Sequence, residues 1–165
     1  MELDGKDLSE MFSDCSSLKD IRGLSVTSNA NAYGMFGESG VTEVDLTKFR
    51  RVKNCRGMFQ DCTSLITVTG HIDSPSDITS MFDGCTKLQS IETTPIVSWP
   101  SAVVAFLDGT LGGYVIKIES SNITSVNYFA RNNNNIRTTV LVPRGSATYS
   151  KFRDSSDANV NILEV

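Results

Sequence analysis

The stretch MFSDCSSL at residues 11–18 decides the fold, because it returns as MFQDCTSL at 58–65 and as MFDGCTKL at 81–88. The phenylalanine of each copy serves as an anchor, and the same step continues along the chain. The anchors are Phe12, Phe36, Phe59, Phe82, Phe106 and Phe129. Their spacings are 24, 23, 23, 24 and 23 residues, so six of the eight phenylalanines share one period of about 23. Such a period predicts an architecture of stacked repeats.

The residues around the anchors form columns that predict the core. Three positions after the anchor the residue is small in every unit: Cys15, Ser39, Cys62, Cys85, Gly109 and Asn132. The apolar columns are Leu18, Leu65 and Leu88, then Ile21, Val44, Val68, Ile91 and Val115, and upstream of the anchor Leu8, Cys55, Ile78 and Ala102. Because the cysteines share a column with serine, glycine and asparagine, we expect them to be small core residues.

Each unit is expected to hold a short helix and a short strand. In SDITSMFDGC (76–85) either Ser76 or Asp77 is a candidate N-cap, and apolar residues follow at i, i+3, i+4 and i+7. In TKLQSIETT (86–94) Leu88 and Ile91 alternate with polar residues, as in a half-buried strand. One such unit cannot bury its apolar side alone, whereas stacked units can, and the sequence therefore predicts a solenoid.

The phrase MFxxCxxLxxI at this step resembles the BspA-like leucine-rich repeats of bacterial surface proteins. The resemblance extends over residues 8–140, closely in the first, third and fourth units and loosely in the others. The last stretch (140–165) resembles the terminal cap of these proteins. The family implies an α/β, right-handed solenoid of about six coils over 1–140, with short parallel strands and short helices. It also implies a C-terminal cap over 141–165, with a helix in 145–154 and a closing strand in 160–165.

Composition excludes several classes of protein. The chain has 165 residues, 39% of them apolar and 21% charged, which suits one globular domain. A net charge of −4 gives no global attraction to nucleic acid or anionic lipid. No apolar run is long enough to cross a membrane, and the first residues do not resemble a signal peptide. The resemblance nevertheless implies a cell-surface or extracellular location, with a phage particle as the alternative.

The residues that could carry chemistry are few. The chain has four cysteines without a C-x-x-C pair and a single histidine, so we expect free buried thiols, no metal and no cofactor. A disulfide between Cys62 and Cys85 on adjacent coils is the alternative. His71 has Asp73 and Asp77 nearby, which is either an acid–base arrangement or a solvated loop. Since no nucleophile or second catalytic group accompanies them, the sequence predicts that the protein is not an enzyme.

One segment concentrates positive charge in an acidic chain. KFRRVKNCR (48–56) contains five cations, namely Lys48, Arg50, Arg51, Lys53 and Arg56. They form either a solvated surface or a patch that docks an anion or a partner. Nucleic acid is not expected, because Phe49, the aromatic residue in the segment, shares an apolar three-residue step with Val52 and Cys55 and no further aromatic residue is interleaved to stack on bases. Trp99 either packs against the solenoid or is a partly exposed binding anchor.

These features predict a non-catalytic binding scaffold. The expected partner is a protein or glycan of a host or a cell surface, and the family resemblance implies adhesion by a bacterium or bacteriophage. The alternative is a structural spacer or assembly module that self-associates end to end. The repeat begins almost at Met1, so we expect an uncovered apolar edge in the first coil. Either a longer chain precedes it, or another subunit packs on it.

Overall fold

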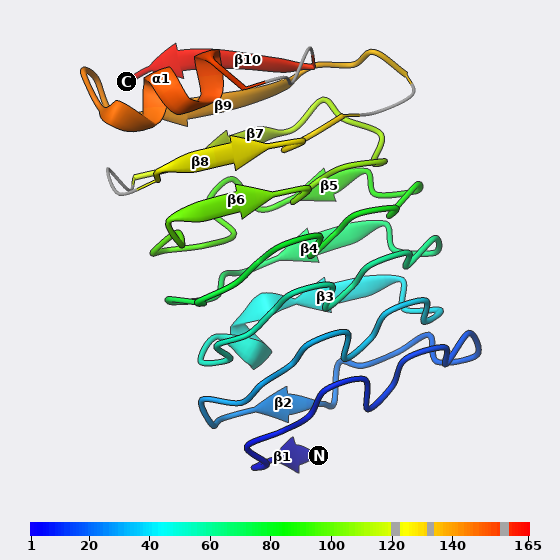
Figure 1. Ribbon diagram of the computed structural model, residues 1–165. Helices are drawn as coiled ribbons and strands as arrows, with labels where there is room; N and C mark the ends of the chain where they lie inside the picture. The colour runs from blue at the N-terminus through cyan, green and yellow to red at the C-terminus, as the bar shows by residue number, and fades with distance from the viewer. Residues whose placement is uncertain (120–122, 132–133, 156–158) are drawn as a thin grey trace.

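The chain is a parallel β-solenoid of about seven turns, seen in a computed structural model that describes residues 1–119, 123–131, 134–155 and 159–165 (Figure 1). The stack of parallel coils predicted from the sequence is confirmed, with about seven turns in place of about six. Its strands are β1 (Glu2–Leu3), β2 (Ser25–Val26), β3 (Glu43–Asp45), β4 (Thr67–Thr69), β5 (Ser90–Ile91), β6 (Ala102–Val104), β7 (Val115–Lys117), β8 (Ser125–Asn127), β9 (Thr138–Val142) and β10 (Val160–Glu164). The helical elements among the described residues are the 3₁₀ helix η1 (Leu46–Phe49) and the α-helix α1 (Ala147–Arg153).

The strands form three hydrogen-bonded columns along the stack. The longest column joins β3, β4 and β5, and then β7, β9 and β10. A bond from the Lys117 amide to the Thr93 carbonyl connects these two sheets at 2.7 Å. The second column contains β6 and β8. The third contains β1 and β2, with a further bridge between Ile72 and Ile96. Within β3 and β4 the central valines, Val44 and Val68, are buried, as the alternating pattern predicts.

The phenylalanine anchors stack on one another in the core. The ring centroids of Phe12 and Phe36 are 5.4 Å apart, those of Phe36 and Phe59 5.3 Å, and those of Phe59 and Phe82 5.6 Å. The interplanar angles are 8°, 6° and 5°, so the four rings lie nearly parallel along the stack. The predicted shared column is therefore confirmed for the first four anchors.

From the fifth coil onward the predicted columns are wrong by one residue. The Ser80 amide bonds to Val104, which makes Leu107, and not Phe106, the equivalent of Phe82. The ring of Phe106 accordingly meets Phe82 at 81° and does not stack on it. The predicted core residues Ala102, Gly109 and Val115 are replaced by Val103, Thr110 and Ile116, which are buried. Asn132 lies outside the described residues.

The short helix predicted at 76–85 does not form. Ser80 has φ of 54° and Gly84 has φ of 72°, and left-handed residues interrupt a right-handed helix. The earlier coils show the same pair, at Glu10 and Asp14, Gly34 and Glu38, and Gly57 and Asp61. We call these turns the anchor corners; they span residues 7–14, 31–38, 54–61, 77–84 and 102–109. Backbone amides of each corner donate to carbonyls of the next coil, as from Phe59 to Met81 at 3.0 Å.

A ladder of Asp and Asn side chains opens the anchor corners. It consists of Asp7, Asn31, Asn54 and Asp77, which are also bridged through their backbones. Each side chain accepts a hydrogen bond from the amide two residues later, for example Asn54 from Arg56 at 3.1 Å and Asp77 from Thr79 at 2.8 Å. Asp77 therefore caps a turn, where the sequence predicted a helix cap. These side chains satisfy amides that the corner would otherwise leave without a partner.

Replacing Asn54 by alanine is expected to lower the free energy of unfolding by about 1 kcal/mol, because the Arg56 amide loses its side-chain acceptor. The loss is measured by urea denaturation followed by circular dichroism. Asn54→Asp is the matched control, since aspartate already fills this column at Asp7 and Asp77. If Asn54→Asp is as destabilising as Asn54→Ala, the ladder does not act through the side-chain oxygen.

The C-terminal end of the stack is covered. Helix α1 lies within the predicted range 145–154, and the ring of Phe152 packs on that of Phe129 at 5.1 Å. Strand β10 pairs in parallel with β9 over Val160–Glu164, within the predicted closing strand. Figure 1 shows both elements at the end opposite β1. Strand β9 crosses the predicted boundary between 1–140 and 141–165, so the cap continues the longest column.

Candidate functional site

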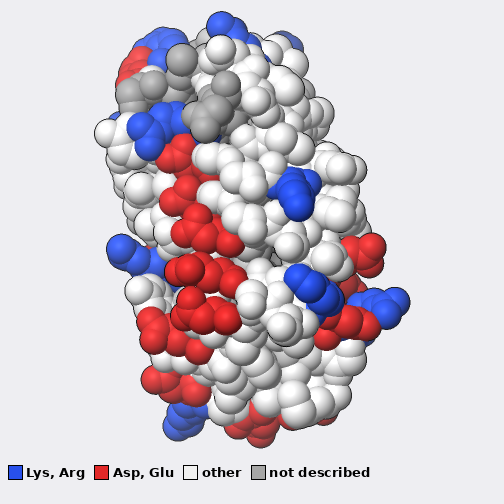
Figure 2. All heavy atoms as spheres, turned by 90° about the vertical axis from the view of Figure 1, so that its right-hand side faces the viewer, with Lys and Arg blue, Asp and Glu red and all other residues white. Residues whose placement is uncertain are grey.

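A stripe of carboxylates follows the anchor corners along the stack. We call it the acidic stripe; it comprises Glu10, Asp14, Glu38, Asp61, Asp83 and Asp108. These residues follow one another because the corners are bonded in register, as from Asp14 to Gly37, Glu38 to Gln60 and Asp61 to Asp83. Figure 2 shows the stripe as a nearly continuous red column on one side of the molecule. Sequence reasoning missed it, although an acid beside nearly every anchor was a signal for it.

A shallow polar groove of about 190 Å³ lies within the acidic stripe. Three carboxylates line it, from Glu10, Glu38 and Asp61. Tyr33 and Gln60 also line it, together with Gly34, Gly37 and Gly57, which carry no side chains. Because glycines bring no side chain between the acids, the groove offers mainly carboxylate oxygens to an incoming cation.

The two ends of the acidic stripe differ in their electrostatics. Arg131 donates to Asp108 at 2.7 Å, and its guanidinium lies 3.9 Å from the centroid of the Tyr128 ring. Burial raises the pKa of Asp83, and the neighbouring charges of Asp108 and Asp61 raise it further. In the part of the chain that the structure describes, Glu10, Glu38 and Asp61 take part in no ion pair. No cation among the described residues is therefore paired with the carboxylates of Glu10, Glu38 and Asp61 in the N-terminal part of the stripe.

Replacing Asp83 by asparagine is expected to raise the urea midpoint at pH 7. The pKa of Asp83 is raised above the ordinary value of 3.8, so its charge opposes folding once the pH exceeds the raised value. Below pH 3.8 both states are protonated and the gain should disappear. Glu38→Gln removes an exposed carboxylate and is the control. An equal gain at pH 7 and pH 3 would contradict the electrostatic cause.

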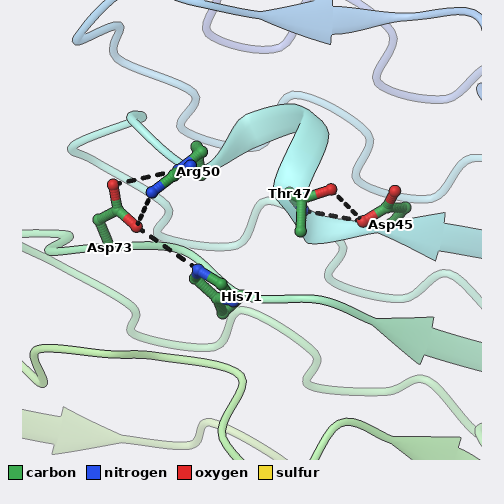
Figure 3. A network of polar contacts seen from close by, with 5 residues as sticks. All are labelled: Asp45, Thr47, Arg50, His71 and Asp73. Carbon is green, nitrogen blue, oxygen red and sulfur yellow. Dashed lines mark hydrogen bonds and ion pairs between the residues drawn. The ribbon is translucent and has the colours of Figure 1, made fainter.

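Two of the five cations in the predicted patch bind partners within the chain. Arg50 donates to both oxygens of Asp73 at 3.3 Å (Figure 3), and Lys53 donates to the carbonyl and hydroxyl of Ser74 at 3.0 Å. Lys48, Arg51 and Arg56 are exposed and make no ion pair with any described residue. The remaining positive surface is thus smaller than the sequence suggested.

Trp99 is a core residue, so of its two predicted roles the packed one is observed and the partly exposed anchor is not. Its side chain is 4% exposed. The indole ring lies 5.2 Å from Phe106 and 6.3 Å from Phe129, between centroids. Trp99 therefore packs beside Phe106 and Phe129, the two anchors that do not continue the parallel stack of the first four phenylalanines.

A second concavity of about 270 Å³ lies beside η1. Its apolar lining comes from Ile21, Val44 and Phe49, and its polar lining from Arg22, Glu43, Asp45, Lys48, Thr67 and Thr69. Asp45 holds the start of η1 by accepting from the amide and hydroxyl of Thr47, at 3.0 and 2.6 Å (Figure 3). The charges around this pocket are mixed, in contrast to the acidic stripe.

His71 lies near Asp73 in a loop between coils. Its Nε2 is 3.7 Å from Asp73 Oδ1, and both side chains are 40% exposed. Figure 3 shows that the same carboxylate also faces Arg50. Asp77 is engaged with the Thr79 amide. The imidazole therefore shares a carboxylate that already has a partner, in an open position.

The cysteines are free thiols, and three of the four are buried. Cys62 donates to the Phe36 carbonyl at 3.0 Å and Cys85 to the Phe59 carbonyl at 3.1 Å. Burial raises the pKa of Cys55, Cys62 and Cys85. Cys15 is exposed, which differs from the buried position predicted for the whole column. The structure groups no three His, Cys, Asp or Glu side chains as metal ligands among the described residues.

Under native conditions iodoacetamide is expected to modify Cys15 alone. Cys55, Cys62 and Cys85 are buried and remain thiols, so they should react only when the fold opens. Peptide mass spectrometry after timed alkylation measures each site, and alkylation in urea supplies the control in which all four sites react. Rapid native modification of Cys62 would contradict the packed core.

The chain matches no known protein-family model, no curated protein and no solved structure. None of the described helices is long and apolar enough to span a membrane.

Proposed function

We propose that the protein is a non-catalytic binding scaffold whose partner is a protein or glycan of a host or a cell surface. The acidic stripe is the observation that carries this proposal, because it presents one sign of charge along successive coils (Figure 2). The corners that hold it are fixed by bonds between coils, such as Glu10 to Tyr33 and Gly34 to Arg56. A surface that is ordered before binding loses little entropy when it binds. The stripe favours a partner with an extended basic surface.

The repeat phrase supports a finer assignment. Its resemblance to BspA-like leucine-rich repeats favours a right-handed solenoid on the surface of a bacterium or in a phage particle, with adhesion as its role. The covered C-terminal end and the buried anchor columns agree with a module that stacks coils and uses their outer residues for recognition. The variable residues between the columns would then select the partner.

A structural spacer or assembly module is the second candidate function. The observation that favours it is the outer side of the first coil, where Met11 is 48% exposed while Met35, Met58 and Met81 are fully buried. An exposed apolar edge favours association with another polypeptide.

An array of basic proteins, neutral glycans and anionic glycans tests the binding proposal. We expect capture of basic proteins that weakens with added salt. The double variant Glu38→Gln/Asp61→Asn should weaken capture by about tenfold or more. Lys48→Gln/Arg51→Gln, which leaves the stripe intact, should not weaken it. Equal capture by both variants would exclude the stripe as the binding surface, and capture of neutral glycans alone would exclude a basic partner. Turnover of a substrate that is lost in His71→Ala would contradict a non-catalytic role.

A further inference from the structure

The outer side of the first coil repeats a surface that is covered everywhere else in the stack. In each anchor corner alternate amides donate to the next coil, always in the same direction. From the first corner the bonds run from Leu8 to Asn31, Glu10 to Tyr33, Phe12 to Met35 and Asp14 to Gly37, at 2.8 to 2.9 Å. The second corner donates to the third at the equivalent positions, as from Phe36 to Met58. Each covered corner therefore receives donors from the coil before it.

The first corner has the same acceptors without the donors. The carbonyls equivalent to those of Asn31, Tyr33, Met35 and Gly37 belong to Asp7, Ser9, Met11 and Ser13. Within the described part of the chain these four carbonyls accept no hydrogen bond. These four carbonyls have the same spacing as the acceptors that each inner corner offers to the coil before it. Their spacing therefore defines the register in which a further coil would bind.

The side chains of the first coil also resemble those of an inner coil, which is covered by the coil before it. Phe12 stacks on Phe36 on one side only, whereas the ring of Phe36 lies between two others. Cys15 is exposed, although Cys62 and Cys85 in its column donate to a phenylalanine carbonyl of the preceding coil. An apolar hollow of about 350 Å³ opens here, lined by Met1, Phe12, Leu18, Asp20, Ile21, Gly23 and Leu24. Covering it would remove apolar surface from water.

A second copy of this chain does not complement that surface. Two first coils that meet corner to corner would oppose acceptor carbonyls to acceptor carbonyls, and Glu10 and Asp14 to the same acids. Stacking the first coil on the far end of another copy meets α1 and β10, where Phe152 already covers Phe129. The required occupant is a donor-bearing coil, whereas the described far end of this chain is closed by α1 and β10.

We propose that the outer side of the first coil binds one further coil of the same parallel repeat. That coil must present backbone amides to Asp7, Ser9, Met11 and Ser13, a phenylalanine ring to Phe12, and a carbonyl to the thiol of Cys15. The proposal rests on continuity with the coil–coil interfaces inside the stack, and it is independent of which partner the acidic stripe binds.

The test adds such a coil to the full chain and measures the reactivity of Cys15. One extension places a copy of residues 72–95 directly before Leu3, because Ile72 and Ile96 occupy successive positions of the column that contains Leu3 and Val26. A second places a copy of residues 49–71 there. The tethered coil is present at a high effective concentration, so the interface need not be strong to form.

We expect native alkylation of Cys15 to slow by about 100-fold in the extended chains, toward the rate of Cys62. An extension of the same composition in scrambled order should leave Cys15 as reactive as before. The proposal is overturned if Cys15 stays reactive in both extended chains while Cys62 stays protected. Loss of protection at Cys62 in both chains also overturns it, because the added coils would then disrupt the stack. Concentration-dependent dimerisation of the unextended chain that protects Cys15 would show that a second copy is the occupant.

Discussion

Replacing Phe59 by alanine is expected to lower the free energy of unfolding by about 3–5 kcal/mol. The ring is fully buried and lies nearly parallel to Phe36 and Phe82, at 5.3 and 5.6 Å. Its removal opens a cavity that two coil–coil interfaces share, and it also removes two aromatic contacts. Urea denaturation followed by circular dichroism measures the loss.

Phe12→Ala is the matched control for Phe59→Ala. Phe12 stands at the end of the same stack, with one ring of the anchor column beside it, and is only partly buried. Its loss should therefore cost clearly less free energy than the loss of Phe59. Equal costs at the two positions would show that stacking along the column is not what stabilises the solenoid.

Replacing Gly40 by alanine is expected to cost about 3 kcal/mol, because the added methyl group has no room. A Cβ at this position would lie 2.1 Å from the backbone oxygen of Ser16. Gly40 also donates to the Cys15 carbonyl at 3.1 Å, so the clash separates the first two coils. Since a solenoid is stabilised by contacts between neighbours, the damage should concentrate in the first coil.

Hydrogen exchange resolved by residue, together with urea denaturation, measures the effect of Gly40→Ala. Gly23→Ala is the control, since a Cβ there meets nothing within 4 Å. We expect faster exchange at Leu8 and Phe12 in Gly40→Ala and no change in Gly23→Ala. Unchanged exchange in both variants would mean that the added methyl group is accommodated without separating the coils.

The period of the chain was predictable, whereas the shape of the corner was not. Phenylalanine spacing located the column from Phe12 to Phe82, but the apolar spacing of Ile78, Met81, Phe82 and Cys85 is shared by a helix and by this corner. The distinction depends on two left-handed residues per corner, and non-glycine residues such as Ser80 adopt that conformation here. Gly34, Gly57 and Gly84, each two positions from an anchor, were the available signal.

The predicted columns depart from the observed register where the number of residues per coil changes. Val68 and Ile91 are 23 residues apart, whereas Ile72 and Ile96 are 24 apart, and a further residue enters before Val104. Counting phenylalanines hides these additions because Phe106 remains in the core beside Trp99.

The candidate site was harder to predict than the fold for a related reason. Acids that lie about 23 residues apart become a stripe only once the coils are in register. Conversely, the cations at 48–56 are adjacent in sequence, yet Arg50 and Lys53 turn toward partners on the next coil, at Asp73 and Ser74. Adjacency in the sequence therefore predicted a larger cationic patch than the fold presents. The acidic stripe was missed because its residues are far apart in the sequence.

The one-way bonding of the anchor corners aligns peptide dipoles along this side of the stack, while bonds elsewhere, such as from Gly40 to Cys15, point the opposite way. Every corner bond directs its amide toward the C-terminal end, from Glu10 to Tyr33 and onward to Ala105 and Asn127. The peptide dipoles add as they do in a helix, with their negative pole at the carbonyls of the first coil. Each additional coil lengthens this dipole without adding net charge. A cationic partner approaching Glu10 and Asp14 therefore meets the field of the whole corner column as well as the two carboxylates.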